Sequence, residues 1–436
     1  MTELSGYTAL GYGGDFGLTG LTETLSAGGR RPDLADALAA AVEQADQSEG
    51  EEAVELGEDA RRLLVPALPD AVLRTVWLAA VGRAFDPADH GIDTRAWFEK
   101  LSELATDRLR QNKRSYAAPR IQPVRDEELS RSIGGEVRAL ARILDQASGL
   151  PGLAHALEEV VTHADADLGM RFFLRALKAY SVPIDQPRAD RFVALGDHFG
   201  YHVAVVYEGL HVMWPPIDTT RRDPTWDFGL SMLAARFGAG LYNHGVSQTV
   251  REVAAADAYD QTPGSVAAQL LQDVKRLLDS GLSAETLAIV WLAAVDSGYD
   301  IDRFGTDGRD WLQQIVEVCE ERLRDVAPTY RPSVPAARTD LIEMVMHEVL
   351  AVEPRAAHKE VSPTWHPIAD TAVMAALKQV VTRVDPDLGF RLFLRAMWAL
   401  RMPLTEDQYT RYETLRRTFD YSEDYLMQIE QLVRRD

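Results

Sequence analysis

Residues 165–177 read DADLGMRFFLRAL, and residues 385–397 read DPDLGFRLFLRAM. The two stretches begin 220 positions apart and share most of their letters. In both, apolar residues recur at steps of three and four, which is the period of a helix that buries one face. The stretches therefore predict two equivalent helices, each packed into a core.

The aspartates that open each stretch predict how these helices begin. Asp167 and Asp387 stand immediately before the apolar run, where a carboxylate can accept hydrogen bonds from the unpaired amides of the first turn. Asp165 and Asp385 add negative charge near the positive end of the helix. We expect helix caps at both places, and a magnesium site is the alternative that paired aspartates raise.

Further matches occur in the same order in both halves of the chain. DFGL occurs at 15–18 and 227–230, VWLAAV at 76–81 and 290–295, and VVT at 160–162 and 380–382. Self-similarity in preserved order is the signature of an internal repeat. The chain of 436 residues is also long enough for two domains. We therefore predict a tandem duplication.

Most of the repeated unit has helical periodicity. The clearest examples are residues 51–68, 69–85 and 94–111, in which apolar residues recur at steps of three and four and charged residues stand between them. Proline-containing breaks at 117–124 and 327–337 predict loops. Residues 201–216 are the exception, because two β-rich runs flank a Glu-Gly dipeptide and predict a hairpin.

The predicted fold is all-α. It consists of two tandem, pseudo-symmetric helical-bundle domains with a small β-hairpin at their junction. The expected boundaries are 1–201 for the first helical repeat domain, 202–226 for the hairpin and linker, and 227–436 for the second helical repeat domain. The sequence leaves the relative orientation of the repeats and the oligomeric state open. A scaffold whose halves imitate a homodimer is a further possibility.

Composition limits the class of protein. Hydrophobic residues make up 46% of the chain, and its apolar runs are too short for a transmembrane helix. The N-terminus lacks the features of a secretory signal, and Cys319 is the only cysteine. A reducing compartment suits a chain that cannot form an internal disulfide. We expect a cytoplasmic protein without a membrane partner.

The net charge is −21, from 67 acidic and 46 basic residues. Such a surface repels nucleic-acid phosphates, so we expect no nucleic-acid partner. A basic protein is the expected partner. The stretch 43–59, with eight acidic residues and no basic one, is expected to be a solvated loop and helix edge, and a docking surface for that partner is the alternative. The alternative is that the acidic residues only keep the protein soluble.

Two arginine pairs are the candidate binding residues. Arg171 with Arg175, and Arg391 with Arg395, are spaced four apart, so each pair leaves one side of its helix. Guanidinium groups bind carboxylates and phosphates through two parallel hydrogen bonds. The alternative is that each pair forms ion pairs with acidic residues of neighbouring helices.

The sequence contains no arrangement of nucleophile and base that predicts catalysis, and it implies no cofactor. Asp197, His198, His202 and His211 have a spacing that metal ligands can use, but half-exposed histidines are the simpler interpretation. We expect no metal. The sequence therefore predicts a non-enzymatic binding module for a basic protein, with an immunity-type inhibitor as one concrete form. The alternative is an enzyme or small-anion binder whose site between the two repeats is lined by the paired arginines.

Overall fold

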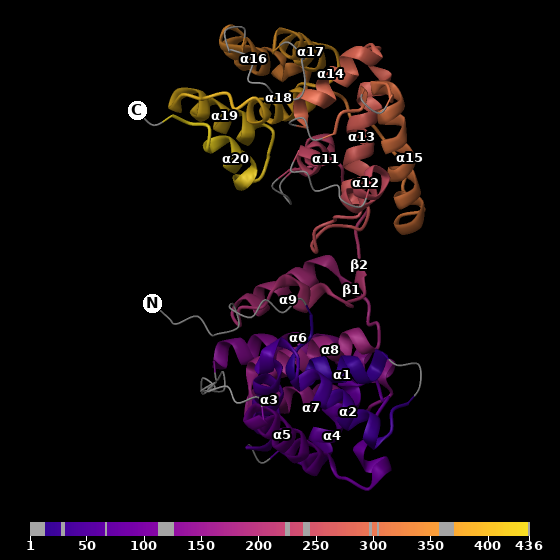
Figure 1. Cartoon of the computed structure of the whole chain (residues 1–436). Helices are drawn as coiled ribbons and strands as arrows, with labels where there is room; N and C mark the ends of the chain where they lie inside the picture. Colours follow the sequence, from indigo (N-terminus) through magenta and orange to yellow (C-terminus); the bar gives the residue numbers. More distant parts are fainter. Residues whose placement is uncertain are drawn as a thin grey trace. The chain divides into compact units, whose positions relative to one another are not determined.

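The computed structural model describes residues 14–27, 31–65, 68–111, 126–222, 227–238, 245–295, 299–302, 305–356 and 370–434. The chain divides into two compact units, Met1–Trp214 and Pro215–Asp436, and each unit has its own hydrophobic core. Nearly all regular structure in the described ranges is helical (Figure 1). The predicted all-α class is confirmed. The predicted linker at 202–226 contains the boundary between the units.

The first unit is a bundle of ten α-helices within the residues that the structure describes. They are α1 (Gly17–Ala27), α2 (Leu34–Ala45), α3 (Glu51–Leu64), α4 (Asp70–Ala80), α5 (Thr94–Gln111), α6 (Glu127–Ser148), α7 (Leu153–Glu159), α8 (Ala166–Ala179), α9 (Gln186–Asp197) and α10 (Val203–Tyr207). Short turns occur at η2 (Ser48–Gly50), η3 (Pro87–His90) and the π-helical η4 (Val160–Ala164).

Helix α8, which contains the first copy of the repeated stretch, is the central helix of this unit. It is buried from Ala166 to Lys178 and packs against α1, α4 and α6. A helix that is covered all round belongs in the middle of a core. Trp77 of α4 adds an aromatic cluster, with ring centroids 5.8 Å from Trp97 and 5.7 Å from Phe98.

The second unit has the same order of main helices. They are α11 (Gly229–Gly238), α12 (Val246–Ala254), α13 (Ser265–Asp279), α14 (Ala284–Ala294), α15 (Gly308–Val326), α16 (Ile342–Ala356), α17 (Asp370–Arg383), α18 (Pro386–Ala399), α19 (Glu406–Thr418) and α20 (Met427–Glu430). Two 3₁₀ turns, η6 (Thr339–Leu341) and η7 (Glu423–Leu426), precede α16 and α20.

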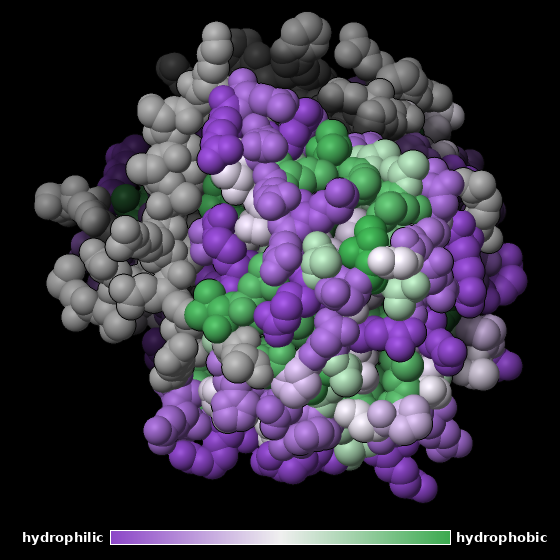
Figure 2. All heavy atoms as spheres, turned by 90° about the horizontal axis from the view of Figure 1, so that it is seen from below, coloured by the Kyte–Doolittle hydropathy of each residue, from purple (hydrophilic) through white to green (hydrophobic). Residues whose placement is uncertain are grey.

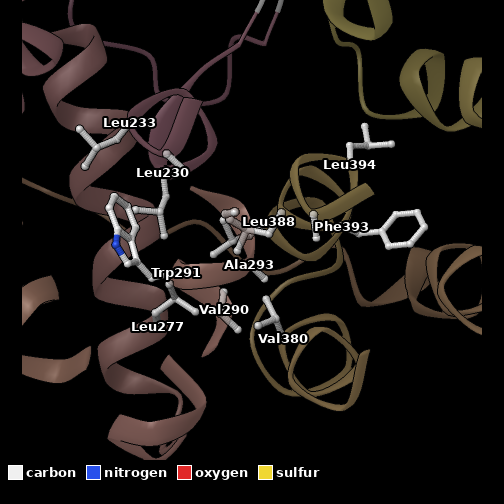
Figure 3. Close-up of a cluster of buried hydrophobic side chains, with 14 of the residues drawn as sticks. Leu230, Leu233, Leu277, Val290, Trp291, Ala293, Val380, Leu388, Phe393 and Leu394 are labelled. Atoms are coloured by element: carbon white, nitrogen blue, oxygen red, sulfur yellow. The ribbon is translucent and has the colours of Figure 1, made fainter. Parts of the chain in front are cut away.

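Helix α18 contains the second copy of the repeated stretch and is again buried, from Pro386 to Met397. Figure 3 shows Leu230, Ala293 and Leu388 between the ribbons of α11, α14 and α18. Leu394 points from α18 away from Val290 and Val380 in the same view. The phenylalanines of both repeated stretches are buried, which confirms their predicted place in the core.

The predicted hairpin at the junction is wrong. Residues Val203–Tyr207 form the short helix α10, and His202 caps it by accepting a hydrogen bond from the amide of Ala204. Strand β2 (Val212–Met213) pairs in parallel with β1 (Ile184–Asp185), so the two β-rich runs do not pair with each other. The β-branched residues of the first run are buried instead against the first core.

This segment also has a counterpart in the last residues of the second unit. Leu404 forms a parallel β-bridge with Val433, after the short helices η7 and α20. The order of short helix and parallel bridge is therefore the same after Tyr201 as after Tyr421.

The remaining predictions concern loops and the molecular surface. The break at 327–337 is irregular, as predicted, whereas 117–124 lies outside the described residues. The face of the molecule in Figure 2 is mostly hydrophilic, with smaller hydrophobic areas between the polar ones. None of the described helices has the length and apolarity needed to cross a membrane.

Candidate functional site: buried arginine networks and a pocket in the second unit

Arg171 lies inside the first unit, with 1% of its surface exposed. Its two terminal nitrogens donate to the two carboxylate oxygens of Asp59, at 2.7 and 2.5 Å. The guanidinium also donates to the carbonyl of Phe16 and lies 4.5 Å from the centre of the Phe16 ring. Burial alone would lower the pKa of Arg171, but Asp167 and Asp59 raise it well above its usual value, so the group stays charged.

Asp167 connects this ion pair to two further elements. It accepts hydrogen bonds from Arg62 of α3 at 3.3 Å and from the hydroxyl of Tyr201. Burial opposes ionisation of Asp167, but Arg171 and Arg62 outweigh it and lower its pKa. The helix cap is Asp165, which accepts a hydrogen bond from the amide of Leu168 at 2.9 Å. The predicted assignment of Asp167 as the cap is therefore wrong by two positions.

The second unit contains the same arrangement around Arg391. Its terminal nitrogens donate to the two carboxylate oxygens of Asp273, both at 2.8 Å, and its Nε donates to Asp387 at 3.0 Å. Phe228 supplies both a carbonyl acceptor at 3.1 Å and a ring 4.4 Å away. The hydroxyl of Tyr421 donates to Asp387 at 2.5 Å. Against its burial, the neighbouring Arg391 and Arg222 lower the pKa of Asp387 to about 2.

Two of the four predicted binding residues, Arg171 and Arg391, are thus held in internal networks. Their carboxylate partners come from α3 and α13 and from the first turn of their own helices. This is the alternative that the sequence leaves open for arginine pairs. Asp59 and Asp273 were missed from the sequence, although each stands two residues before a matched stretch, RRLL at 61–64 and KRLL at 275–278.

Arg175, the third predicted residue, belongs to a second cluster in the first unit. Its Nε donates to the carbonyl of Ala80 at 3.1 Å, and one terminal nitrogen lies 3.7 Å from Asp15. The ammonium of Lys178 donates to Asp15 and to the carbonyl of Val205, both at 2.8 Å. The side chains of Lys178 and Asp15 are each only 3% exposed, so this ammonium is bound inside the protein.

Arg395, the fourth predicted residue, lines a pocket of about 390 Å³ in the second unit. The pocket lies beside α18, near η7 and α20. Helix α20 packs on α18 (Figure 1). Leu394, a buried residue of the core cluster, is also part of its wall. The other lining residues are Asp227, Arg391, Trp398, Asp424, Tyr425, Met427, Gln428 and Ile429.

Arg395 and Asp227 are two of the polar side chains of this pocket. Arg395 donates to the side-chain oxygen of Gln428 at 3.1 Å. Asp227 accepts hydrogen bonds from the Ser231 hydroxyl at 2.6 Å and from the Tyr425 hydroxyl at 3.3 Å. Burial raises the pKa of Asp227, so a cation brought close to it would favour its charged form.

The pocket occupies the position in the second unit that corresponds to the Lys178 cluster of the first. Asp227 and Asp15 both precede the matched Phe-Gly-Leu, and Arg395 and Arg175 are the second arginines of the repeated stretches. Three residues after each of these arginines the units differ, because the first has Lys178 and the second has Trp398. One face of the Trp398 ring is covered by Arg401, whose guanidinium carbon is 4.3 Å from the ring centre.

A second, more open hollow of about 350 Å³ lies between α16 and α19. Its lining includes the ion pair of Arg411 with Glu348, together with Met344 and His347. An equivalent ion pair joins Arg191 of α9 to Glu136 of α6 in the first unit. The hollow therefore surrounds a contact that both units make between the corresponding helices.

The acidic stretch 43–59 is mostly structural. Glu52, Glu55 and Asp59 are buried, and Glu52 accepts hydrogen bonds from the amide of Gly17 at 3.2 Å and from Gln44 at 2.9 Å. Asp46 forms an ion pair with Arg108. The buried carboxylates of this stretch therefore belong to the core contacts of α1 rather than to a solvated edge, whereas Glu43 and Asp46 are exposed.

Within the described ranges, no group of three or more His, Cys, Asp or Glu side chains could hold a metal ion. His202 caps α10, and His211 lies 2.9 Å from the carbonyl of Ser181. Cys319 is buried in α15, and burial raises the pKa of its thiol to about 12. A protonated, covered thiol is a poor nucleophile.

Comparisons with known proteins give no match. No protein-family model fits the chain, and no curated protein or solved structure is similar to it. The site must therefore be interpreted from its own geometry.

Proposed function

We propose that the chain is a non-enzymatic binding module that arose by tandem duplication. Corresponding residues make corresponding contacts in both units, which supports the duplication. The ion pair of Arg171 with Asp59 matches that of Arg391 with Asp273, and the hydrogen bond from the Trp77 indole to the carbonyl of Phe85 matches that from Trp291 to Tyr299. Arg95 donates to the carbonyls of Leu64 and Leu68, as Arg309 does to those of Leu278 and Leu282. The parallel pairing of Ile184 with Val212 matches that of Leu404 with Val433.

We propose a basic protein as the partner, and the pocket of the second unit as its specific point of contact. The observation that carries this proposal is the lining of the pocket, in which Asp227 and Asp424 are combined with the aromatic rings of Trp398 and Tyr425. The net charge of −21 supports it, because complementary fields accelerate association with a cationic partner. An immunity-type inhibitor of a basic toxin, in a reducing cytoplasm, is a concrete form.

Binding to a panel of basic proteins, measured at about 50 mM and about 500 mM salt, tests the proposal. The higher concentration screens the attraction between exposed charges. We expect at least one partner whose affinity falls about tenfold or more at the higher salt. The Asp424→Asn variant should weaken that binding, whereas Glu320→Gln, which removes an acid of an exposed ion pair with Lys275, should leave it within about twofold. Binding that is unaffected by salt in every case would contradict the proposal.

A small anionic ligand is the second candidate, because Arg395 lines the same pocket. Guanidinium groups bind carboxylates and phosphates well. Thermal-shift screening against carboxylated and phosphorylated metabolites tests this candidate. A ligand-induced shift that Arg395→Lys abolishes and the matched Arg175→Lys retains would favour an anion over a basic partner.

A further inference from the structure

We infer that the pocket of the second unit binds a primary ammonium group at the end of an apolar chain, as in a lysine side chain, with Asp227 as the acceptor. The inference rests on the proposed function, since it specifies which group of a basic partner enters the pocket. It starts from a difference between the two units at a single matched position.

The first unit contains the expected ligand as one of its own side chains. The ammonium of Lys178 donates to Asp15 and to the backbone carbonyl of Val205 at 2.8 Å, and both charged side chains are almost completely covered. The aliphatic part of Lys178 passes Gly209, where a side chain would come within 3.8 Å of it. This cluster shows which interactions the fold offers to an ammonium at this position.

The second unit keeps the acceptor but has no lysine at the matched position. Asp227 corresponds to Asp15 and lines the pocket, while Trp398 replaces Lys178. The space of about 390 Å³ next to Trp398 and Tyr425 is ample for a butylammonium group. An indole and a phenol ring are suitable neighbours for the methylene chain and for the cation itself.

The charges of the lining favour a cation over an anion. Arg391 is already paired with Asp273 and Asp387 in the network beneath the pocket. Besides Arg391, the charged residues of the lining are two carboxylates, Asp227 and Asp424, and one guanidinium, Arg395. With both carboxylates ionised, an entering ammonium would balance this lining, whereas an entering carboxylate would add to a negative excess.

Calorimetric titration of the full chain tests the inference with three probes of similar size. These are n-butylamine, N-acetyl-lysine methylamide and butyrate. We expect both amines to bind and butyrate not to bind. Binding of butyrate alone would overturn the assignment. If n-butylamine bound and the lysine derivative did not, the ammonium site would stand, but a lysine of a protein partner could not be its ligand. The proposed function would then fail while the ammonium site remained.

Three variants test the geometry. Trp398→Lys reproduces the first unit, and its own ammonium should reach Asp227 and weaken amine binding at least tenfold. Asp227→Asn should have the same effect, while the conservative Trp398→Phe should keep the affinity within about threefold. The control Met344→Lys adds a lysine at the α16–α19 hollow and should change nothing. Unchanged amine affinity in Asp227→Asn would exclude the site, even if Trp398→Lys did not fold.

The first unit provides the reciprocal experiment. Lys178→Ala removes the internal ammonium from Asp15, and we expect the number of bound n-butylamine molecules to rise from one to two. The added amine should also restore part of the thermal stability that this variant loses. A stoichiometry that stays at one, without recovery of stability, would show that the two clusters are not equivalent and would overturn the inference.

Discussion

Arg391 and Asp273 form a bidentate ion pair, in which each terminal nitrogen of the guanidinium donates to one oxygen of the carboxylate at 2.8 Å. Arg391 is 1% exposed, and the amide of Leu230 donates to the same carboxylate at 2.8 Å. The pair therefore joins α18 and α13 to the start of α11. Its geometry determines how the second unit responds to the loss of either charge.

Replacing Asp273 with Asn should destabilise the protein strongly. The amide keeps the shape of the side chain but leaves a buried guanidinium with a reduced counter-charge, which typically costs about 3–5 kcal/mol. Urea-induced unfolding followed by circular dichroism measures this loss. The control is Glu320→Gln, which breaks the exposed pair with Lys275 and should cost less than about 1 kcal/mol. Equal losses in the two variants would show that the buried pair contributes little.

Substitution of Gly229 by Ala tests the close approach of α11 to this pair. Gly229 has a φ of +61°, and an added Cβ would lie 2.0 Å from the Asp273 carboxylate. The control is Gly281→Ala, because Gly281 has a φ of +70° but no atom within 4 Å of the added Cβ. The control should cost about 1–2 kcal/mol through backbone strain alone. Gly229→Ala should cost at least about 2 kcal/mol more, since the ion pair must move.

Much of the helical architecture follows from local sequence. The stretch 94–111 is predicted as a helix, and α5 covers Thr94–Gln111. Its apolar residues recur with the helical period, so no distant contact is needed to recognise it. The hairpin prediction fails because the β-branched run at Val203–Tyr207 is short, and in such a run burial and a capping histidine override β propensity.

The networks and the pocket could not be predicted in the same way. Arg171 and Arg175 are both visible in the sequence, but their partners Asp59 and Asp15 lie more than a hundred positions earlier. The exchange of Lys178 for Trp398 is also visible in the sequence. Its consequence for the pocket can be inferred only from the structure, in which Lys178 binds Asp15, and Trp398 and Asp227 line the same pocket. The differences between the two units at matched positions therefore depend on contacts between distant segments, which periodicity does not encode.

Cys319 should be unreactive in the folded protein. The thiol is fully buried in α15, and burial raises its pKa to about 12. At pH 8 its thiolate fraction should be roughly a thousandfold below that of an ordinary cysteine, in addition to the lack of access. Labelling with a thiol-specific disulfide reagent should be slow in buffer and fast in urea.

Since Cys319 is the only cysteine, its labelling reports opening of the second unit alone. Moving the thiol to the matched buried position of the first unit, in the double variant Cys319→Ala and Ala105→Cys, should give a corresponding probe there. Native-state labelling at the rate of a free cysteine would disprove the burial of α15.

Glu55 should make the first unit sensitive to pH. It is buried in α3, and burial, followed by the nearby charge of Asp59, raises its pKa from 4.5 to about 8. The folded state therefore holds the proton more tightly than the unfolded chain. The contribution of protonated Glu55 to the free energy of unfolding is complete below about pH 4.5. It is lost as the pH rises to about 8, and the loss reaches roughly 4 kcal/mol.

The variant Glu55→Gln tests this pH dependence. The second unit has Gln269 at the matched position of α13, so the fold accepts an amide there. We expect little difference from the unmodified protein at pH 5 and a clear gain in stability at pH 8, measured by urea unfolding at both values. The control Glu58→Gln removes a carboxylate from the same helix that is already paired with Arg61, and should change stability by less than about 1 kcal/mol at either pH. If Glu55→Gln changed the stability by the same amount at both pH values, Glu55 would not titrate in this interval. The buried carboxyl would then have to be held in its charged form by Arg171 and Arg62.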